Sequence, residues 1–132
     1  MTAPPGSWKG SFGERMGLTY TEVEPGRARA VLEVRPEHLN PTGFCHGGVL
    51  FTCADDALGG AVYGLTPQGH HPTSNQVNIH ITRSVQVGDR ITVETRALSH
   101  GRRTALLEAR LTDEEGRLVA LATASCLFVE DR

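Results

Sequence analysis

Apolar and polar residues alternate along most of the chain from Leu18 onward. The clearest runs of this kind cover residues 27–34, 76–82, 91–97 and 104–111. A period of two sends successive side chains to opposite faces of a strand, so each run predicts a β-strand with one buried face. Turn-forming residues separate the strands, at Pro25-Gly26, Gly88-Asp89, His100-Gly101 and Glu114-Glu115-Gly116. The pattern therefore predicts a mainly antiparallel sheet.

Two segments depart from this simple alternation. Residues 118–129 are apolar or small at almost every position, which predicts a strand that is central in the sheet or covered on both faces. Between residues 49 and 62, apolar side chains recur at helical spacing, and most remaining positions are small or aromatic. We therefore expect one long helix that is surrounded by the rest of the protein. The residues FGERMG (12–17) predict one short helical turn ahead of the first strand.

The order of these elements is two strands, a long helix and then four strands, which predicts an α+β fold. In this fold a curved, mainly antiparallel sheet of about six strands wraps around one long central helix. Since a single sheet leaves one face of the helix poorly covered, we expect the chain to form an oligomer. Residues 1–11 are rich in Pro, Gly and Ser and predict a flexible N-terminal segment, followed by a single domain over residues 12–132.

Composition narrows the class of protein further. With 132 residues, of which 39% are hydrophobic and 21% charged, the chain has the size and composition of one globular domain. A net charge of −2 indicates neither nucleic acid nor an anionic membrane as a partner. The sequence shows no signal-peptide pattern and no apolar stretch of membrane-spanning length. Its three cysteines form no CxxC pair, so we expect a cytoplasmic protein without disulfides.

The segment CHGGVLFTCADDALGG (45–60) combines an apolar helix with residues that can carry chemistry. Gly47 and Gly48 lie at the expected start of the helix, where the first backbone amides lack an intrahelical acceptor. Another molecule can approach these amides closely, and the helix dipole favours an oxygen that becomes anionic there. The alternative is that the two glycines only permit tight packing. His46 is either an acid–base group or a structural residue.

Two adjacent carboxylates, Asp55 and Asp56, lie in the middle of this predicted helix. Burying an unpaired carboxylate is costly, so Asp55 requires a partner, a raised pKa or a water-lined cavity. A catalytic role satisfies this requirement, and so does a capping or ion-paired role at a subunit interface. Because successive helix residues are turned by about 100°, Asp56 cannot serve the same site as Asp55 equally well.

Three further groups of polar residues have both a functional and a structural interpretation. Asn40 either holds a water or a carbonyl, or only forms the turn that is common for Asn before Pro. Within HGRRT (100–104), Arg102 and Arg103 can bind phosphate oxygens together with backbone amides, or belong to a solvated hairpin. The histidines at positions 70, 71 and 80 lack the spacing of metal ligands, so we expect no metal site.

The stretch HLNPTGFCHGGVLFTCADDALGGA (38–61) resembles the signature region of a known family, the hotdog-fold acyl-CoA thioesterases of the PaaI type, which are the phenylacetate-degradation thioesterases. The features that match in order and spacing are Asn40, His46-Gly47-Gly48, Leu50-Phe51 and Ala54-Asp55. The similarity extends from about Phe12 to Val129, with weaker matches outside the signature. The resemblance implies the hotdog fold, in which the sheet wraps around the central helix.

The resemblance also implies a role for each matched residue. Asp55 corresponds to the catalytic carboxylate, which acts as a nucleophile or as a general base on water. Gly47 corresponds to the glycine whose backbone N–H polarises the thioester carbonyl, with His46 beside it. Asn40 and Ser74 correspond to residues that position the attacking water or the thioester. The residues expected to contact coenzyme A are Gly48, Gly101, Arg102, Arg103 and Thr104.

Under this resemblance the protein hydrolyses an acyl-CoA thioester to a free acid and coenzyme A, without a cofactor because coenzyme A is part of the substrate. The two halves of each site come from different subunits, so the homodimer is the minimal active unit, and a homotetramer is expected. The acyl group is of phenylacetyl type or of medium chain length. Asp56 stands where relatives often have a small or hydroxyl residue, and the small pair Gly59-Gly60 leaves room for a bulky acyl group.

Two other functions on the same fold stay open. A hydratase or dehydratase pairs a histidine with a carboxylate for proton transfer on the acyl chain. Such enzymes usually follow the histidine with apolar and Pro-Gly positions, which His-Gly-Gly does not match. A non-catalytic acyl-CoA-binding protein would use the same fold without cleaving the thioester, but it has no need of the carboxylate of Asp55.

Overall fold

A computed structural model of the protein describes residues 8–132. Along the chain the elements are α1 (Phe12–Arg15), β1 (Thr19–Glu24), β2 (Arg27–Glu33), a 3₁₀ turn η2 (Pro36–His38), α2 (Gly47–Tyr63), β3 (His70–Ile81), β4 (Arg90–His100), β5 (Thr104–Thr112) and β6 (Leu118–Glu130). The long helix, the short helical turn and the strands are all present where the alternation and the helical spacing predict them. The structure differs from these predictions only in where some elements begin or end and in how far their residues are buried.

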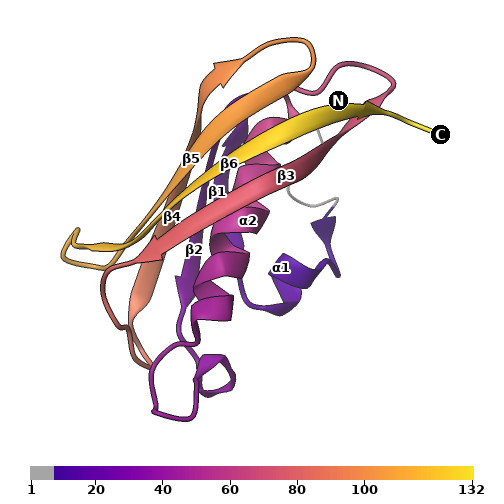
Figure 1. The fold of residues 1–132 in the computed structure, drawn as a ribbon. Coiled ribbons are helices and arrows are strands. Elements are labelled where there is room, and N and C mark those ends of the chain that lie inside the picture. The colour runs from indigo at the N-terminus through magenta and orange to yellow at the C-terminus, as the bar shows by residue number, and fades with distance from the viewer. Residues whose placement is uncertain (1–7) are drawn as a thin grey trace.

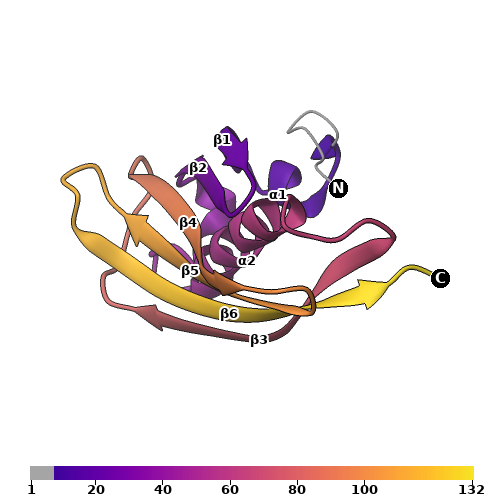
Figure 2. The same ribbon diagram turned by 90° about the horizontal axis from the view of Figure 1, so that it is seen from above.

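The six strands form one antiparallel sheet in the order β1-β2-β4-β5-β6-β3. The sheet curves around α2, which lies in its hollow, and α1 lies on the side of α2 that faces away from the middle of the sheet (Figure 1 and Figure 2). This arrangement confirms the predicted curved sheet around one long helix. It leaves β1 and β3 as the two edge strands.

The core lies between α2 and the concave face of the sheet, because alternate strand residues point toward the helix. Buried and exposed residues alternate along β2, β4 and β5 as predicted. One buried hydroxyl group contacts both the sheet and the helix. The hydroxyl of Thr95 in β4 lies 3.2 Å from the carbonyl oxygen of Ala28 in β2 and 3.2 Å from that of Ala57 in α2. This hydroxyl therefore links the helix to the sheet.

The structure adds detail on the two strands at one side of the sheet, β6 and β3. β6 lies inside the sheet between β5 and β3, but only its inward face is buried, and Leu127 and Val129 are 40% and 39% exposed. Of the two alternatives predicted for this segment, a central strand or a strand covered on both faces, the structure shows the central strand. β3 begins at His70, ahead of the alternating run that starts at residue 76. Its pairing register shifts between Ser74 and Gln76. Such a bulge hides the period of two.

Helix α2 is less covered than its apolar sequence predicts. The residues that face the sheet are buried, and they include Cys53, Ala54, Ala57, Leu58 and Ala61. On the opposite side Phe51 is 37% exposed, and Asp55 is exposed as well. The sheet of one chain covers only one side of the helix, and the other side is the poorly covered face that is expected for a single sheet.

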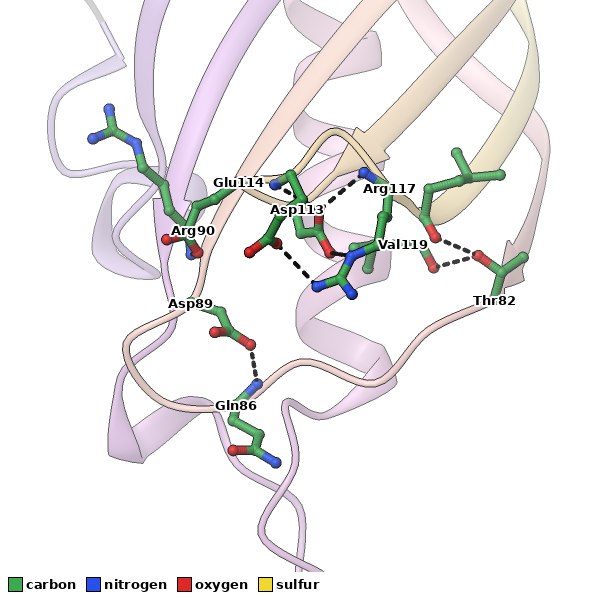
Figure 3. Close-up of polar contacts among 10 residues, drawn as sticks. Thr82, Gln86, Asp89, Arg90, Asp113, Glu114, Arg117 and Val119 are labelled. Carbon is green, nitrogen blue, oxygen red and sulfur yellow. Dashed lines mark hydrogen bonds and ion pairs between the residues drawn. The ribbon is translucent and has the colours of Figure 1, made fainter.

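Polar contacts close the turns at the end of the sheet where β5 meets β6 (Figure 3). The carboxylate of Asp113 accepts hydrogen bonds from the backbone and the side chain of Arg117, at 2.9 and 2.8 Å. In a nearby loop the carboxylate of Asp89 accepts the backbone N–H of Gln86 at 2.8 Å. Gly116 has a φ of 77°, a conformation that favours glycine over other residues. The turn chemistry expected at both places is thus realised by specific contacts.

The predicted flexible segment, residues 1–11, falls mostly on residues 1–7, which lie outside the described part of the chain. Within residues 8–11, the ring of Trp8 packs edge-on against that of Tyr20 in β1, with the centroids 4.9 Å apart. In residues 8–132 no helix is long and apolar enough to cross a membrane.

Candidate active site

The start of α2 presents a backbone amide that a ligand oxygen can reach. Gly47 is the first helical residue, so its N–H has no intrahelical acceptor. The N–H of Gly48 instead donates to Nδ1 of His46, the N-cap residue, at 2.8 Å. Since that ring nitrogen accepts, the neutral His46 ring carries its proton on Nε2. Of these two glycine amides, the one at Gly47 is left for a ligand, while His46 acts as a cap.

The end of β3 lies close to the backbone of Gly47. An ideal Cβ at Gly47 would lie only 3.2 Å from Cδ1 of Ile81, at the end of β3. This is tighter than an ordinary van der Waals contact, so a side chain would have to displace Ile81. The candidate oxyanion donor therefore lies against the end of an edge strand.

The side chain of Asn40 organises the loop that precedes the helix. Its Oδ1 accepts hydrogen bonds from the N–H of Thr42 at 3.0 Å, the hydroxyl of Thr42 at 2.7 Å and the N–H of Phe44 at 3.1 Å. The amide oxygen thus serves turn formation, which is the structural interpretation of this residue. Its side-chain NH₂ group makes no hydrogen bond with residues 8–132, so this group is what Asn40 can offer to a water or a carbonyl.

Asp55 lies in the middle of α2, near β3 and β6. Burial raises the pKa of the Cys126 thiol in β6, the hydrogen bond with Ser74 lowers this pKa, and the negative charge of Asp55 raises it. The hydroxyl of Ser74 in β3 lies 3.7 Å from the sulfur of the same cysteine. Asp55 therefore lies on the helix that packs against β3 and β6, the strands that carry Ser74 and Cys126.

The electrostatics of Asp55 suit a base. Partial burial of its carboxyl raises its pKa, and the adjacent charge of Asp56 raises it further. Within residues 8–132 no donor forms a hydrogen bond or ion pair with this carboxylate, so an ion-paired or capping role would need a residue of another subunit. A carboxylate with a raised pKa is a better proton acceptor than an ion-paired one.

One chain cannot bring Gly47 and Asp55 to the same carbonyl group. Both residues belong to α2, and a helix rises about 1.5 Å per residue, so the interval between positions 47 and 55 corresponds to about 12 Å. An oxyanion donor and an attacking group must each lie roughly 3 Å from the reacting atoms. Two such residues can act on one thioester only if they come from different copies of the chain.

The second carboxylate, Asp56, is explained by contacts that the sequence did not predict. Its Oδ2 accepts a hydrogen bond from the hydroxyl of Tyr20 in β1 at 2.6 Å. An ideal Cβ at Gly13 in α1 would lie 2.5 Å from Cγ of Asp56, so the carboxylate fills the place of a side chain there. Burial and the hydrogen bond to Asp56 raise the pKa of Tyr20, which therefore stays protonated and donates.

Asp56 also forms part of the wall of a cavity of about 370 Å³. The cavity lies between the C-terminal half of α2, β1 and the start of β3, and its lining includes Trp8, Tyr20, Gly59, Gly60, Tyr63 and Pro72. An ideal Cβ at Gly59 would meet no atom within 4 Å, which agrees with the expectation that this glycine leaves room. The aromatic walls come from distant segments, and no local pattern in the sequence could have identified them.

The HGRRT hairpin lies far from Gly47 of the same chain. The N–H of Gly101 donates to the carbonyl of Thr104 at 2.9 Å, and the carbonyl of Arg103 accepts the N–H of Phe128 at 2.9 Å. This pairing places the hairpin beside the end of β6 that pairs with the first residues of β3. Gly47 lies at the opposite end of β3. The side chains of Arg102 and Arg103 are exposed and form no hydrogen bond or ion pair with residues 8–132.

The histidines do not gather at a metal site. In the described part of the chain no cluster of three or more His, Cys, Asp or Glu side chains is placed to hold a metal ion. His71 instead contacts Asp131, with its Nδ1 2.9 Å from the carboxylate oxygen.

The sheet order, the central helix and the helix-start glycine together define the hotdog class of folds. The chain belongs to the thioesterase superfamily, whose family model matches residues 42–120, more than half of the chain. It is therefore a thioester hydrolase, and the PaaI-type resemblance seen in the sequence is confirmed.

Curated relatives carry names that agree with this family. A protein of Mycobacterium tuberculosis described as an esterase is 34% identical over 112 residues, which cover 83% of this chain and 79% of the relative. The 1,4-dihydroxy-2-naphthoyl-CoA hydrolase of Listeria monocytogenes is 29% identical over 129 residues, 90% of this chain and 96% of the relative. The acyl-coenzyme A thioesterase PaaI of Escherichia coli is 26% identical over 106 residues, 80% of this chain and 74% of that enzyme.

Solved structures share the fold over nearly the whole described chain. A mutant of the phenylacetic acid degradation protein PaaI from Thermus thermophilus aligns with a TM-score of 0.82 at 31% identity, covering 88% of this chain and 96% of that one. A thioesterase of Streptococcus pneumoniae in complex with coenzyme A aligns with a TM-score of 0.79 at 27% identity, covering 87% and 90% of the two chains.

Proposed function

We propose that the protein hydrolyses an acyl-CoA thioester to a free carboxylic acid and coenzyme A. The observation that carries this proposal is the raised pKa of the unpartnered Asp55 carboxylate on the same helix that presents the Gly47 amide. Relatives named acyl-coenzyme A thioesterase and 1,4-dihydroxy-2-naphthoyl-CoA hydrolase support it. The reaction needs only water besides the substrate, so we propose no cofactor.

In the proposed reaction the N–H of Gly47 donates to the thioester carbonyl oxygen and stabilises the negative charge that develops there. Asp55 either attacks the carbonyl carbon itself or takes a proton from a water whose oxygen attacks. The carbon–sulfur bond then breaks, and the thiolate of coenzyme A leaves and takes up a proton. The hydroxyl of Ser74 and the side-chain NH₂ of Asn40 position the water and the thioester. Losing one oxyanion donor typically costs about 10²–10³ in kcat.

The site is completed by a second copy of the chain. The edge strand β3 has free backbone groups that can pair with another strand. Antiparallel pairing of β3 with β3 of a second copy sets the Ile81 end of one strand against the Pro72 end of the other. Gly47, which lies against Ile81, then comes beside Asp55 and Ser74 of the other chain. The homodimer is thus the minimal active unit in this proposal.

The same pairing gives the HGRRT hairpin a function. The hairpin lies at the end of its own β3 that the partner's Gly47 approaches, so Arg102 and Arg103 become available to the phosphate groups of coenzyme A, beside Gly101 and Thr104. The Streptococcus pneumoniae relative is a structure with coenzyme A bound. The exposed apolar residues on the outer face of the sheet, Leu98, Leu106 and Leu127, suit a further contact between two dimers in a homotetramer.

The direct test is a thiol-release assay over a panel of acyl-CoA thioesters that includes phenylacetyl-CoA and octanoyl-CoA. Asp55→Asn should abolish turnover, while light scattering still shows the dimer. Asp56→Asn is the matched control on the same helix, and its effect should be milder. Equal turnover by Asp55→Asn and the unmodified protein would show that Asp55 is not the catalytic carboxylate.

A mixing experiment tests the shared site. Gly47→Pro removes the amide hydrogen at the first helical position, where the helix backbone accepts proline, although the added ring must shift the end of the Ile81 side chain. Gly47→Pro and Asp55→Asn should each be inactive as homodimers. Co-expression should restore activity, because a mixed dimer contains one site with Gly47 from one chain and Asp55 from the other. No recovery in purified mixed dimers would contradict a site built from two subunits.

The same assays distinguish the two other functions. A hydratase or dehydratase would convert enoyl-CoA or 3-hydroxyacyl-CoA thioesters without releasing coenzyme A. A non-catalytic binding protein would bind acyl-CoA tightly, and no thiol would appear with any thioester of the panel. Either result would replace the hydrolase proposal.

A further inference from the structure

A buried histidine lies at the base of the loop that leads into α2. His38 is the last residue of the 3₁₀ turn η2, and only 1% of it is exposed. Its Nδ1 accepts the N–H of Arg35 at 3.0 Å, and its Nε2 lies 2.7 Å from the carbonyl oxygen of Met16. Because Nδ1 accepts and a carbonyl oxygen cannot donate, the ring is neutral and carries its proton on Nε2. Both ring nitrogens are therefore engaged in hydrogen bonds.

The backbone of the same histidine contacts the residue that caps α2. The carbonyl oxygen of His38 accepts the N–H of His46 at 2.8 Å, and His46 directly precedes Gly47. Next to this hydrogen bond, Leu39 and Cys45 pair as an isolated antiparallel bridge. The loop between His38 and His46 is thus closed at its base. A displacement of His38 therefore moves the residue to which the Gly47 amide is attached.

The ring connects this loop to the end of α1, which lies 22 positions earlier in the chain. Met16 is the C-cap residue of α1, and its carbonyl oxygen also accepts a hydrogen bond from the guanidinium of Arg35 at 3.2 Å. The next residue, Gly17, has a φ of 98°, and an ideal Cβ there would lie 3.1 Å from Cζ of Arg35. The Met16 carbonyl is therefore fixed by close packing, and it offers His38 a firmly placed acceptor.

We propose that His38 is a positioning residue for thioester hydrolysis, which holds the Gly47 amide where the oxyanion forms. Its ring binds the Met16 carbonyl, and its own carbonyl binds His46, so it acts through the loop and not on the substrate. The inference rests on the proposed function, because it takes the Gly47 N–H as the oxyanion donor. Such a donor stabilises the transition state only if it is in place before the reaction, and a misplacement of about 1 Å can cost about 10²-fold in rate.

The first test separates positioning from stability. His38→Ala should lower kcat by about 10- to 100-fold with the fastest thioester of the panel. KM should change by less than about threefold, because the exposed arginines of the HGRRT hairpin are untouched. The matched control is Thr66→Val, which removes a buried hydroxyl that donates to the carbonyl of Val62 at 3.0 Å, near the other end of α2. It should lower Tm but keep kcat within about twofold. An unchanged kcat in His38→Ala, or an equal loss of kcat in both variants, would overturn the inference.

Two conservative variants divide the contacts of the ring. The amide of glutamine reaches about as far from the backbone as Nε2 of histidine, so His38→Gln can still donate to the Met16 carbonyl. The amide of asparagine reaches only as far as Nδ1, so His38→Asn can still accept the N–H of Arg35 but does not reach Met16. His38→Gln should therefore keep a kcat about fivefold or more above that of His38→Asn, the equivalent of one hydrogen bond. The opposite order would show that His38 only closes its own 3₁₀ turn, and it would overturn the inference.

Failure of this inference and failure of the proposed function give different results. Thiol release that His38→Ala leaves unchanged would overturn the inference and leave the hydrolase intact. Without thiol release from any thioester, the hydrolase proposal fails, and NMR of the backbone amides then decides whether His38 holds the loop. His38→Asn should shift the amide signals of His46 and Gly47 and speed their hydrogen exchange, whereas His38→Gln should leave both near those of the unmodified protein. Unchanged signals in His38→Asn would overturn the inference. If His38→Ala does not fold, the order of the two conservative variants decides.

Discussion

Replacing glycine by alanine at two places in one helix should change stability in opposite directions. Gly59 lies inside α2, and an ideal Cβ there meets no atom within 4 Å. Gly64 is the C-cap residue of the same helix, and its Cβ would lie 2.9 Å from the backbone Cα of Pro25. Neither glycine has a positive φ, so backbone strain does not enter the comparison. Whether the free energy of unfolding rises or falls therefore depends on the atoms that surround the added methyl group.

The magnitudes follow from these surroundings. In a helix interior alanine is more favourable than glycine by about 0.8–1.0 kcal/mol, so Gly59→Ala should raise the free energy of unfolding by about that amount. For a chain of this size, about 1 kcal/mol corresponds to roughly 3–5 °C in Tm. Gly64→Ala pushes against the turn at Pro25, and overpacking of this kind costs about 1–3 kcal/mol. It also strains the hydrogen bond from the N–H of Gly26 to the carbonyl of Ala61, now 2.8 Å.

The assay is thermal unfolding of the two variants and the unmodified protein at one fixed chain concentration, because oligomer stability depends on concentration. A Tm for Gly59→Ala at or below that of the unmodified protein would refute the reasoning, as would a Tm for Gly64→Ala that is not lowered. The Gly59 methyl group also enters the cavity. The stabilised variant should therefore lose more turnover with ring-containing acyl groups than with acetyl-CoA, an exchange of activity for stability.

Three further predictions concern other parts of the molecule. The raised folded-state pKa of Asp55 means that the stability of the unmodified protein falls as pH rises from the unfolded value of 3.8 through the folded one. In urea unfolding, Asp55→Asn should therefore be more stable than the unmodified protein at pH 7 and equally stable at pH 3. The difference at pH 7 should be less than about 1 kcal/mol, because solvent screens this exposed carboxylate. A difference in stability that does not change with pH would contradict this prediction. Thr95→Val should lower the free energy of unfolding by about 1–2 kcal/mol, since it removes the buried hydroxyl donor that lies between the carbonyl oxygens of Ala28 and Ala57, whereas Thr95→Ser should lose less. Gly13→Ala should lower Tm because its Cβ meets the carboxylate of Asp56, and the loss should disappear when Asp56→Ala is combined with it; a loss that persists in the double variant would exclude this contact as the cause.

The elements themselves were predictable because their signals are local. Buried and exposed positions alternate in β2, β4 and β5 as the sequence indicates, and α2 has the apolar spacing of a helix. The start of β3 was not predictable, because the register shift between Ser74 and Gln76 interrupts the period of two. The sequence did not show which residues of β6 and α2 would be exposed within one chain. Apolar composition shows that a surface avoids water, but it does not show whether the same chain or another one covers it.

The candidate site likewise has features that the sequence predicted and features that it did not. The motif that contains His46, Gly47 and Asp55 is contiguous in sequence, so its resemblance to a family could be recognised directly. Part of the geometry of this motif could not be predicted from the sequence. The hydrogen bond from Gly48 to His46 became apparent only in the structure, whereas the interval of about 12 Å between Gly47 and Asp55 follows from the rise of the predicted helix. That interval, together with the edge position of β3, is the basis of the proposal that one site is built from two chains.

By itself, the sequence determined the succession of strands and helix, the helix-start glycines and the mid-helix acids, since each depends on neighbours within a few positions. Only the tertiary structure decided what Asp56 does. Its partner Tyr20 and the space at Gly13 come from segments far away in the chain, brought to the helix by the folding of β1 and α1 against it. Local periodicity carries no information about such contacts, because they depend on how elements pack in space.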